Sequence, residues 1–202
     1  SKHCRHLHFE CLQGNFEWIS MGRPMVANFE KELNEMEEGR RLGTALNWNL
    51  DYVKNLTNKA IRRLDKVRLK HKKAAMLLVT KNLKDAEKAE KWLSLNHPDK
   101  KVVVVHSDSQ EDAQDVLDNF DESDAHICIC VDMVTEGVDI KRFRVIVYAT
   151  NKLSRLRFNQ TVHRGTRRMG DDDIVCYVFI PCDKRALRFA KELLDEVFED
   201  VD

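Results

Sequence analysis

From residue 74 onward, short apolar runs alternate with longer stretches in which apolar residues recur every three or four positions. The apolar runs span residues 74–80, 101–106, 125–131, 144–150 and 173–181. The amphipathic stretches between and after them span residues 82–96, 109–120, 154–167 and 183–198. Fully apolar strands that alternate with amphipathic helices are typical of βαβ units. The pattern therefore predicts an α/β fold, with a parallel sheet covered by helices on both faces.

The first 73 residues follow a different pattern. Alternation over residues 5–20, with a turn at residues 13–15, predicts a β-hairpin. A helix rich in acidic residues is expected over residues 26–38, and a long amphipathic helix over residues 49–72. The basic end of the long helix fits either a solvated helix terminus or a flank that contacts nucleic acid.

Two interpretations of residues 1–73 remain open. In the preferred one, the hairpin adds antiparallel strands to the sheet edge and the long helix packs on one face. Residues 1–73 are then an integrated extension of a domain formed by residues 74–202. In the other, they form a separate small subdomain. Few Pro, Ser or Gly residues mark a linker, which favours the integrated arrangement.

Charge and composition narrow the classes of function. The chain carries 34 basic and 34 acidic residues, so any attraction to nucleic acid must come from local patches. No apolar run is long enough to span a membrane and no secretory signal is found, so no membrane partner is expected. The first residues are Ser-Lys without an initiator Met, which suggests a piece of a longer protein.

Six cysteines are scattered along the chain without a C-x-x-C motif. We therefore expect reduced, buried thiols in a cytoplasmic protein. The segment from residue 3 to residue 11 is rich in His and Cys, but no matching second pair of ligands follows it. No metal site is predicted for this reason.

In parallel α/β sheets, ligands bind beyond the carboxyl ends of the strands. This rule draws attention to residues 80–81, 106–108, 131–139 and 150–151. In the third of these loops, Gly137 permits a close approach of the backbone to a ligand. Asp139 is suited to accept hydrogen bonds from ribose hydroxyls, although it could equally cap an ordinary turn.

The amphipathic stretch 154–167 carries Gln160, Arg164 and Arg167 at positions i, i+4 and i+7. On a helix these side chains would share one face. Because arginine grips phosphate oxygens in a planar fork and keeps its charge, this face is suited to bind a polyanion. The alternative is a solvated basic helix.

These two segments resemble known motifs. Residues 131–140 (VDMVTEGVDI) resemble motif V of superfamily 2 helicases, and Gln160, Arg164 and Arg167 resemble the spacing of their motif VI. Residues 74–81 occupy the place of motif IV, and residues 106–108 resemble the His-Ser loop that follows it. The resemblance covers roughly residues 74–198 and implies the second, C-terminal RecA-like domain of such a helicase. The sequence TEGVDI in motif V and the sequence SRLRF, which leads into motif VI, are most similar to those of the DNA helicase and translocase branch.

The resemblance also implies roles for individual residues. Arg164 and Arg167 would be catalytic arginine fingers on the γ-phosphate of ATP. The residues implied in ATP binding are Gln160, Gly137 and Asp139. Those implied in contacts with the nucleic-acid backbone are Thr80, Lys81, Ser107 and Thr135. The sequence departs from the family pattern at His163, where motif VI usually has glycine, and at Val131, which replaces a common threonine.

Two parts of a complete motor are missing from the sequence. It contains neither a Gly-x-x-x-x-Gly-Lys-Ser/Thr loop nor an Asp-Glu-x-His/Asp box. In superfamily 2 helicases these parts bind ATP and Mg²⁺ and lie on the first RecA-like domain. The resemblance thus implies a fragment that needs that domain as partner, acts on DNA (with RNA as the alternative) and is inactive as an ATPase alone.

Two other classes of protein stay in view. The first is a non-catalytic RecA-like module that binds nucleic acid or protein. The second is an unrelated α/β enzyme with Cys128 or Cys130 as nucleophile.

Overall fold

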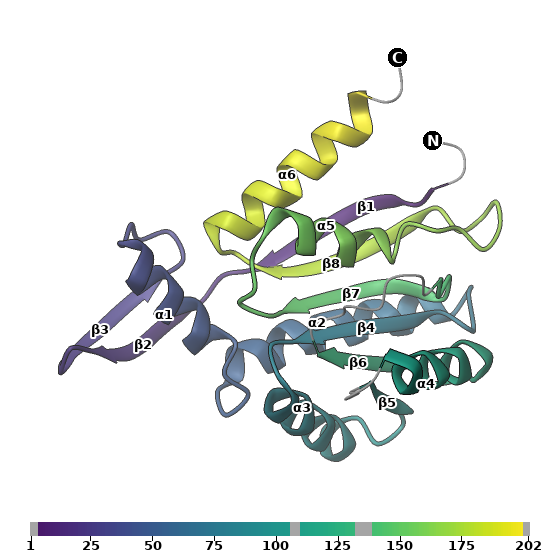
Figure 1. Ribbon diagram of the computed structural model, residues 1–202, viewed down its shortest axis with the longest axis horizontal. Helices are drawn as coiled ribbons and strands as arrows, with labels where there is room; N and C mark the ends of the chain where they lie inside the picture. The colour runs from purple at the N-terminus through teal and green to yellow at the C-terminus, as the bar shows by residue number, and fades with distance from the viewer. Residues whose placement is uncertain (1–3, 106–109, 132–138, 200–202) are drawn as a thin grey trace.

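A six-stranded sheet forms the centre of the protein (Figure 1). The computed structural model describes residues 4–105, 110–131 and 139–199. The strand order is β1-β8-β7-β4-β6-β5, and every neighbouring pair is parallel. The strands are β1 (His6–Leu12), β4 (Ala75–Thr80), β5 (Val102–Val105), β6 (Ile127–Val131), β7 (Phe143–Ala149) and β8 (Val175–Pro181). The predicted α/β class is confirmed.

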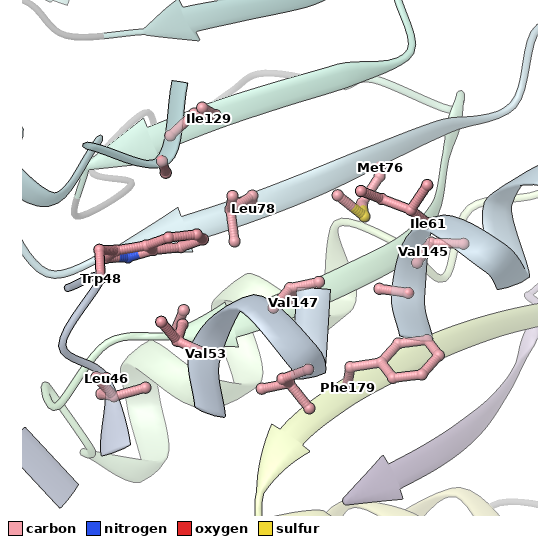
Figure 2. Close-up of a cluster of buried hydrophobic side chains, with 14 of the residues drawn as sticks. Leu46, Trp48, Val53, Ile61, Met76, Leu78, Ile129, Val145, Val147 and Phe179 are labelled. Carbon is pink, nitrogen blue, oxygen red and sulfur yellow. The ribbon is translucent and has the colours of Figure 1, made fainter. Parts of the chain in front are cut away.

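Helices cover both faces of this sheet, which gives three layers. Helices α2 (Asp51–Arg68) and α3 (Leu83–Asn96) pack on one face. Helices α4 (Gln110–Glu122), α5 (Arg155–His163) and α6 (Lys184–Glu199) pack on the other. Figure 2 shows the first face, where Met76 and Leu78 of β4 meet Val53 and Ile61 of α2. Because alternate strand residues enter opposite cores, every residue of β4 is buried.

The elements predicted from residue 74 onward all form. Their ends lie within two residues of the predicted ones, except for the helix expected over residues 154–167. The long N-terminal helix is also confirmed as α2. Its basic end is more exposed than its middle, and its inward stripe includes Leu56, Ala60 and Leu64, which are fully buried.

The predicted N-terminal hairpin is wrong. β1 does not turn back on itself but joins the sheet edge in parallel with β8, from His6 opposite Val175 to Leu12 opposite Pro181. Gly14, which suggested the turn, has another reason to lack a side chain. A Cβ there would lie 2.9 Å from the ring of Tyr52, so the chain passes too close to α2 for a larger residue.

The hairpin lies one strand further along. β2 (Asn15–Ser20) and β3 (Arg23–Asn28) pair antiparallel in a separate two-stranded sheet. Met21 and Gly22 make the turn, and both have positive φ angles, of 50° and 75°. This combination is what a two-residue turn of type I′ requires.

The helix expected over residues 26–38 is also wrong. β3 occupies the first of these residues, and α1 (Glu35–Ala45) begins later. Asn34 defines its start, because its side chain accepts a hydrogen bond from the backbone N–H of Glu37. Acidic side chains in the first turn, including Glu35 and Glu38, favour a helix that begins here.

The cysteines differ from expectation. Cys11, near the end of β1, and Cys182, just after β8, form a disulfide with a Cα–Cα distance of 5.1 Å. The prediction of reduced thiols is therefore wrong for this pair. Cys4 is exposed rather than buried, whereas Cys128, Cys130 and Cys176 are free and buried as expected. Within the described ranges, no helix has the length and apolar character to cross a membrane.

The division between residues 1–73 and 74–202 remains a prediction. β1 is an edge strand of the sheet and α2 covers one face of the sheet, whereas β2, β3 and α1 lie together beyond the carboxyl ends of the strands (Figure 1).

Candidate functional site

The helix that carries the candidate arginines ends earlier than predicted. α5 begins after Ser154, whose hydroxyl accepts from the backbone N–H of Arg157, and ends at His163. Arg164 is its C-cap residue. Arg167 lies outside the helix and forms an isolated antiparallel β-bridge with Cys4. The expectation that the candidate residues share one helical face is therefore wrong.

Gly165 explains this early end. A Cβ at Gly165 would lie 2.3 Å from Sγ of Cys176 and 2.9 Å from Cδ1 of Ile146. The chain is thus pressed against β7 and β8 at this point. The backbone N–H of Gly165 donates to the carbonyl of Val162 at 2.9 Å, a tighter turn than an α-helix makes. Contact with the sheet therefore sets the direction in which the chain leaves α5.

Arg167 nevertheless meets the other candidate motif. Its Nη1 forms an ion pair with Oδ2 of Asp139. The two side chains remain 59% and 38% exposed, so solvent or a ligand can reach them. Asp139 precedes β7 and Arg167 precedes β8, and these strands are neighbours in the sheet. The structure thus brings together one residue from each motif.

Arg164 lies within electrostatic reach of this pair. Burial lowers the pKa of Arg164. Among the nearby groups, Arg167 lowers this pKa further, whereas Cys130 and Asp139 raise it. A guanidinium keeps its positive charge in proteins, so two cations and one carboxylate lie within electrostatic range of one another. Such a set is suited to an anionic ligand that also presents a hydroxyl group.

The remaining candidates for ATP binding are placed as follows. Gln160 is exposed on α5, one turn before Arg164. His163 is also exposed, so it does not face the sheet. Gly137, together with the nucleic-acid candidates Ser107 and Thr135, lies outside the described residues.

The described candidates for nucleic-acid contact lie at the carboxyl ends of the strands, away from the amino ends of β7 and β8, which Asp139 and Arg167 precede. Thr80 is the last residue of β4, and Lys81 follows it. Thr80 is fully buried, and its Oγ1 lies 3.4 Å from the carbonyl oxygen of Cys130. Its side chain therefore has no path to a phosphate in this structure. Lys81 is half-buried, with Nζ 3.3 Å from the carboxylate of Asp85.

The carboxyl-end rule thus locates only part of the candidate site. Thr80 and Lys81 lie at the carboxyl ends of the strands, as the rule predicts. Asp139, Arg164 and Arg167 gather near the amino ends of β7 and β8 instead. The described candidates thus form two separate groups at opposite ends of the strands, in place of the single crevice that we expected.

Sequence reasoning missed a buried ionic cluster beside the arginine site. Nε and Nη2 of Arg5 donate to the carboxylate of Asp173 at 2.6 and 2.5 Å. Nε of Arg144 lies 2.7 Å from the same carboxylate, in an ion pair that lacks hydrogen-bond geometry. Burial would raise the pKa of Asp173. The hydrogen bonds from Arg5 and from the backbone N–H of Met169, with the charges of both arginines, outweigh burial and lower it.

The alternative of a cysteine nucleophile finds no support. Cys128 and Cys130 are buried, with their sulfur atoms 3.5 Å apart in a hydrogen bond. This hydrogen bond and burial raise the pKa of Cys128 well above its usual value. Burial also raises the pKa of Cys176, to about 12. Thiols in this state are poor nucleophiles, because the thiolate is the reactive form.

A parallel sheet covered by helices on both faces is the architecture of a RecA-like α/β domain. Residues 58–169 match the family described as "Helicase conserved C-terminal domain", which is more than half of the chain. The chain therefore belongs to this family, and it is a C-terminal RecA-like domain of the superfamily 2 helicase type.

A solved structure agrees with this assignment of the fold, and two curated proteins are similar in sequence. Domain 2 of the DEAD-box helicase Mss116p, solved bound to an RNA duplex, is similar with a TM-score of 0.54 and 13% identity. The match covers 71% of this chain and 55% of that one. The uncharacterized protein Rv2917 of Mycobacterium tuberculosis is 27% identical over 92% of this chain. ML1624 of Mycobacterium leprae, also uncharacterized, is 25% identical over 92%. The chain spans 30% and 31% of these two relatives.

Proposed function

We propose that this chain is the second motor domain of an ATP-dependent DNA helicase or translocase. In this role it supplies Arg164 and Arg167 to an ATP molecule held mainly by the first RecA-like domain of the same parent protein. The ion pair between Arg167 and Asp139, with Arg164 within electrostatic range of both, is the observation that supports the proposal most directly.

The residues at this edge fit a nucleotide. Two guanidiniums match the oxygens of a terminal phosphate, and a partly exposed carboxylate matches ribose hydroxyls. Bound ATP with Mg²⁺ supplies the phosphoryl group to be transferred. Arg164 and Arg167 stabilise the negative charge that develops on that group. In the described arrangement Asp139 holds Arg167 at the surface, so Arg167 exchanges or shares this partner when it binds phosphate.

The nucleic-acid contact is proposed at the opposite ends of the strands, where β4 ends. The proposed contacts there are Lys81 and the backbone at Thr80. Ser107 and Thr135, which lie outside the described residues, are proposed as further contacts on the resemblance alone. Contacts to phosphates carry no base information, so binding is independent of sequence. We propose DNA rather than RNA as the ligand, because the sequences of residues 131–140 and of the segment before motif VI resemble those of DNA translocases.

The decisive experiment uses the full-length parent protein. We expect ATP hydrolysis that DNA stimulates more than RNA. Arg164→Ala and Arg167→Ala should each lower kcat by about 10³-fold or more, the usual effect of losing an arginine finger. Arg155→Ala is the matched control: this exposed arginine lies on α5 but pairs with Glu192 and Glu196, so kcat should not change.

The isolated chain should neither bind ATP tightly nor hydrolyse it. Robust hydrolysis by this fragment, abolished by Arg164→Ala, would contradict the proposal. A parent protein that binds DNA but shows no ATPase activity would favour the non-catalytic binding module instead. A parent stimulated only by RNA would reverse the preference for DNA.

A further inference from the structure

We propose that Arg5 is a positioning residue, which holds Asp139 and Arg167 at the separation that binding of the nucleotide requires. This inference rests on the proposed function. Arg5 lies at the entry to β1, far outside residues 58–169 that match the helicase family. The device therefore belongs to the N-terminal extension of this chain rather than to the matched segment.

The guanidinium of Arg5 joins two loops. Its Nη1 donates to the carbonyl oxygens of Phe143 at 2.6 Å and Gly165 at 2.8 Å. Its Nη2 donates to the carbonyl oxygen of Lys141 at 2.5 Å. Lys141 follows Asp139 by two residues, and Gly165 lies between Arg164 and Arg167. One buried side chain thus ties together the backbones that carry both halves of the candidate site.

The backbone around Arg5 adds a second attachment. The N–H of Arg5 donates to the carbonyl of Thr166 at 2.6 Å, and Cys4 forms the β-bridge with Arg167. Arg167 lies outside any regular element and has no helix to fix it. The two residues that precede β1 supply this support.

Asp173 completes the arrangement. Its carboxylate accepts two hydrogen bonds from Arg5 and a third, at 2.8 Å, from the backbone N–H of Met169. The loop that contains Arg167 is therefore pinned on both sides, at Gly165 by Arg5 and at Met169 by Asp173. The side chain of Arg5 has no exposed surface, so the pairing is shielded from solvent.

These hydrogen bonds of Arg5 and Asp173 have a functional consequence, because catalysis by positioned charges depends steeply on geometry. A displacement of about 1 Å can lower a rate by about 100-fold. Lysine at position 5 keeps the positive charge but presents one nitrogen in place of a planar fork. It cannot reach both loops and the carboxylate together, so Asp139 and Arg167 would lose their fixed separation.

The test compares Arg5→Lys with Arg41→Lys in the full-length parent. Arg41 is the matched control, because it is also fully buried and donates to the backbone carbonyls of Asn28 and Lys31, away from the site. Both variants should lower Tm. Only Arg5→Lys should lower kcat for ATP hydrolysis, by about 100-fold with little change in KM, at a temperature where both are folded.

A double variant separates positioning from general damage. Because Arg5 acts through Arg167, Arg5→Lys combined with Arg167→Ala should have the kcat of Arg167→Ala alone. If Arg5→Lys does not fold, Asp173→Asn takes its place. It keeps the hydrogen bonds of Arg5 to the carbonyl oxygens and weakens those of the Asp173 side chain to Arg5 and to the backbone of Met169. It should lower kcat by about tenfold.

The outcomes are distinguishable. If Arg167→Ala lowers kcat but Arg5→Lys does not, or Arg41→Lys lowers it equally, the positioning role is wrong and the proposed function stands. Additive losses in the double variant would also overturn the positioning role. If Arg167→Ala leaves kcat unchanged, both proposals fail.

Discussion

Arg167 forms an ion pair with Asp139 at the surface, whereas Arg5 pairs with Asp173 only a few residues away in complete burial. The two pairs share the same chemistry and differ in exposure. Exposed pairs contribute little to folding, since water already solvates both partners. Buried pairs leave an uncompensated charge when one partner is lost. Their effects on stability and on activity should therefore separate.

We expect Asp139→Asn to change the free energy of unfolding by less than about 1 kcal/mol. Asp173→Asn should cost about 3–5 kcal/mol, because Arg5 and Arg144 would keep their charges without a counterion. Urea denaturation of the isolated chain, followed by circular dichroism, measures both values. Equal losses would show that exposure does not distinguish these carboxylates.

Gly165 sets where α5 ends, and a single methyl group tests this. Gly165→Ala should destabilise the chain by about 1–3 kcal/mol, because the new Cβ would overlap Sγ of Cys176 and crowd Ile146. Gly170 is the matched control, since a Cβ there meets no atom within 4 Å. Gly170→Ala should stay within about 0.5 kcal/mol of the original protein. Thermal unfolding of the two variants side by side decides the matter, and similar midpoints would refute the packing explanation.

The disulfide between Cys11 and Cys182 closes most of the chain into one loop, with a sequence separation of 171. Its removal should therefore cost about 2–5 kcal/mol. Cys11→Ser should show this loss without reductant and no further loss with it. Cys4→Ser, which removes an exposed free thiol, should behave like the original protein. Urea midpoints with and without dithiothreitol measure the effect, and titration of free thiols confirms the oxidation state.

Much of the sheet could be predicted from local pattern. Residues 74–79 and 145–149 are apolar at every position, which is typical of a strand covered on both faces. The partner of β1 could not be predicted in this way. Alternation shows that residues 6–12 form a strand, but a parallel and an antiparallel neighbour leave the same alternation. Met21 also gave no turn signal, because methionine rarely adopts a positive φ.

The sequence named the candidate residues of the site but not their arrangement. Asp139 and Arg167 could be named from their motifs, because the residue types and spacing in a short motif indicate the chemistry that they perform. The end of α5 depends on contact between Gly165 and Cys176 of β8, which no local pattern contains. The pairing of Arg5 with Asp173 joins residues 168 positions apart, so only the folded sheet brings them together.

The response to pH follows from the lowered pKa of Asp173. Its ordinary pKa is 3.8, and in the folded chain burial raises this value less than Arg5, Met169 and Arg144 lower it. A carboxylate whose folded pKa is depressed binds protons more readily in the unfolded state. Its contribution to stability is therefore complete well above pH 3.8 and is lost as the pH falls through the lower, folded pKa.

The comparison between the original chain and Asp173→Asn isolates this contribution. Other carboxylates with lowered pKa, such as Asp99 and Asp124, weaken both proteins in acid alike. We expect the difference in free energy of unfolding between the two proteins to be constant from about pH 7 to pH 5 and to narrow below about pH 4. Urea denaturation at each pH measures it. The narrowing should persist at about 1 M salt, because a buried pair is screened far less than an exposed one. A difference that widens as the pH falls would show that Asp173 is protonated more readily in the folded chain, and the buried cluster would then need another explanation.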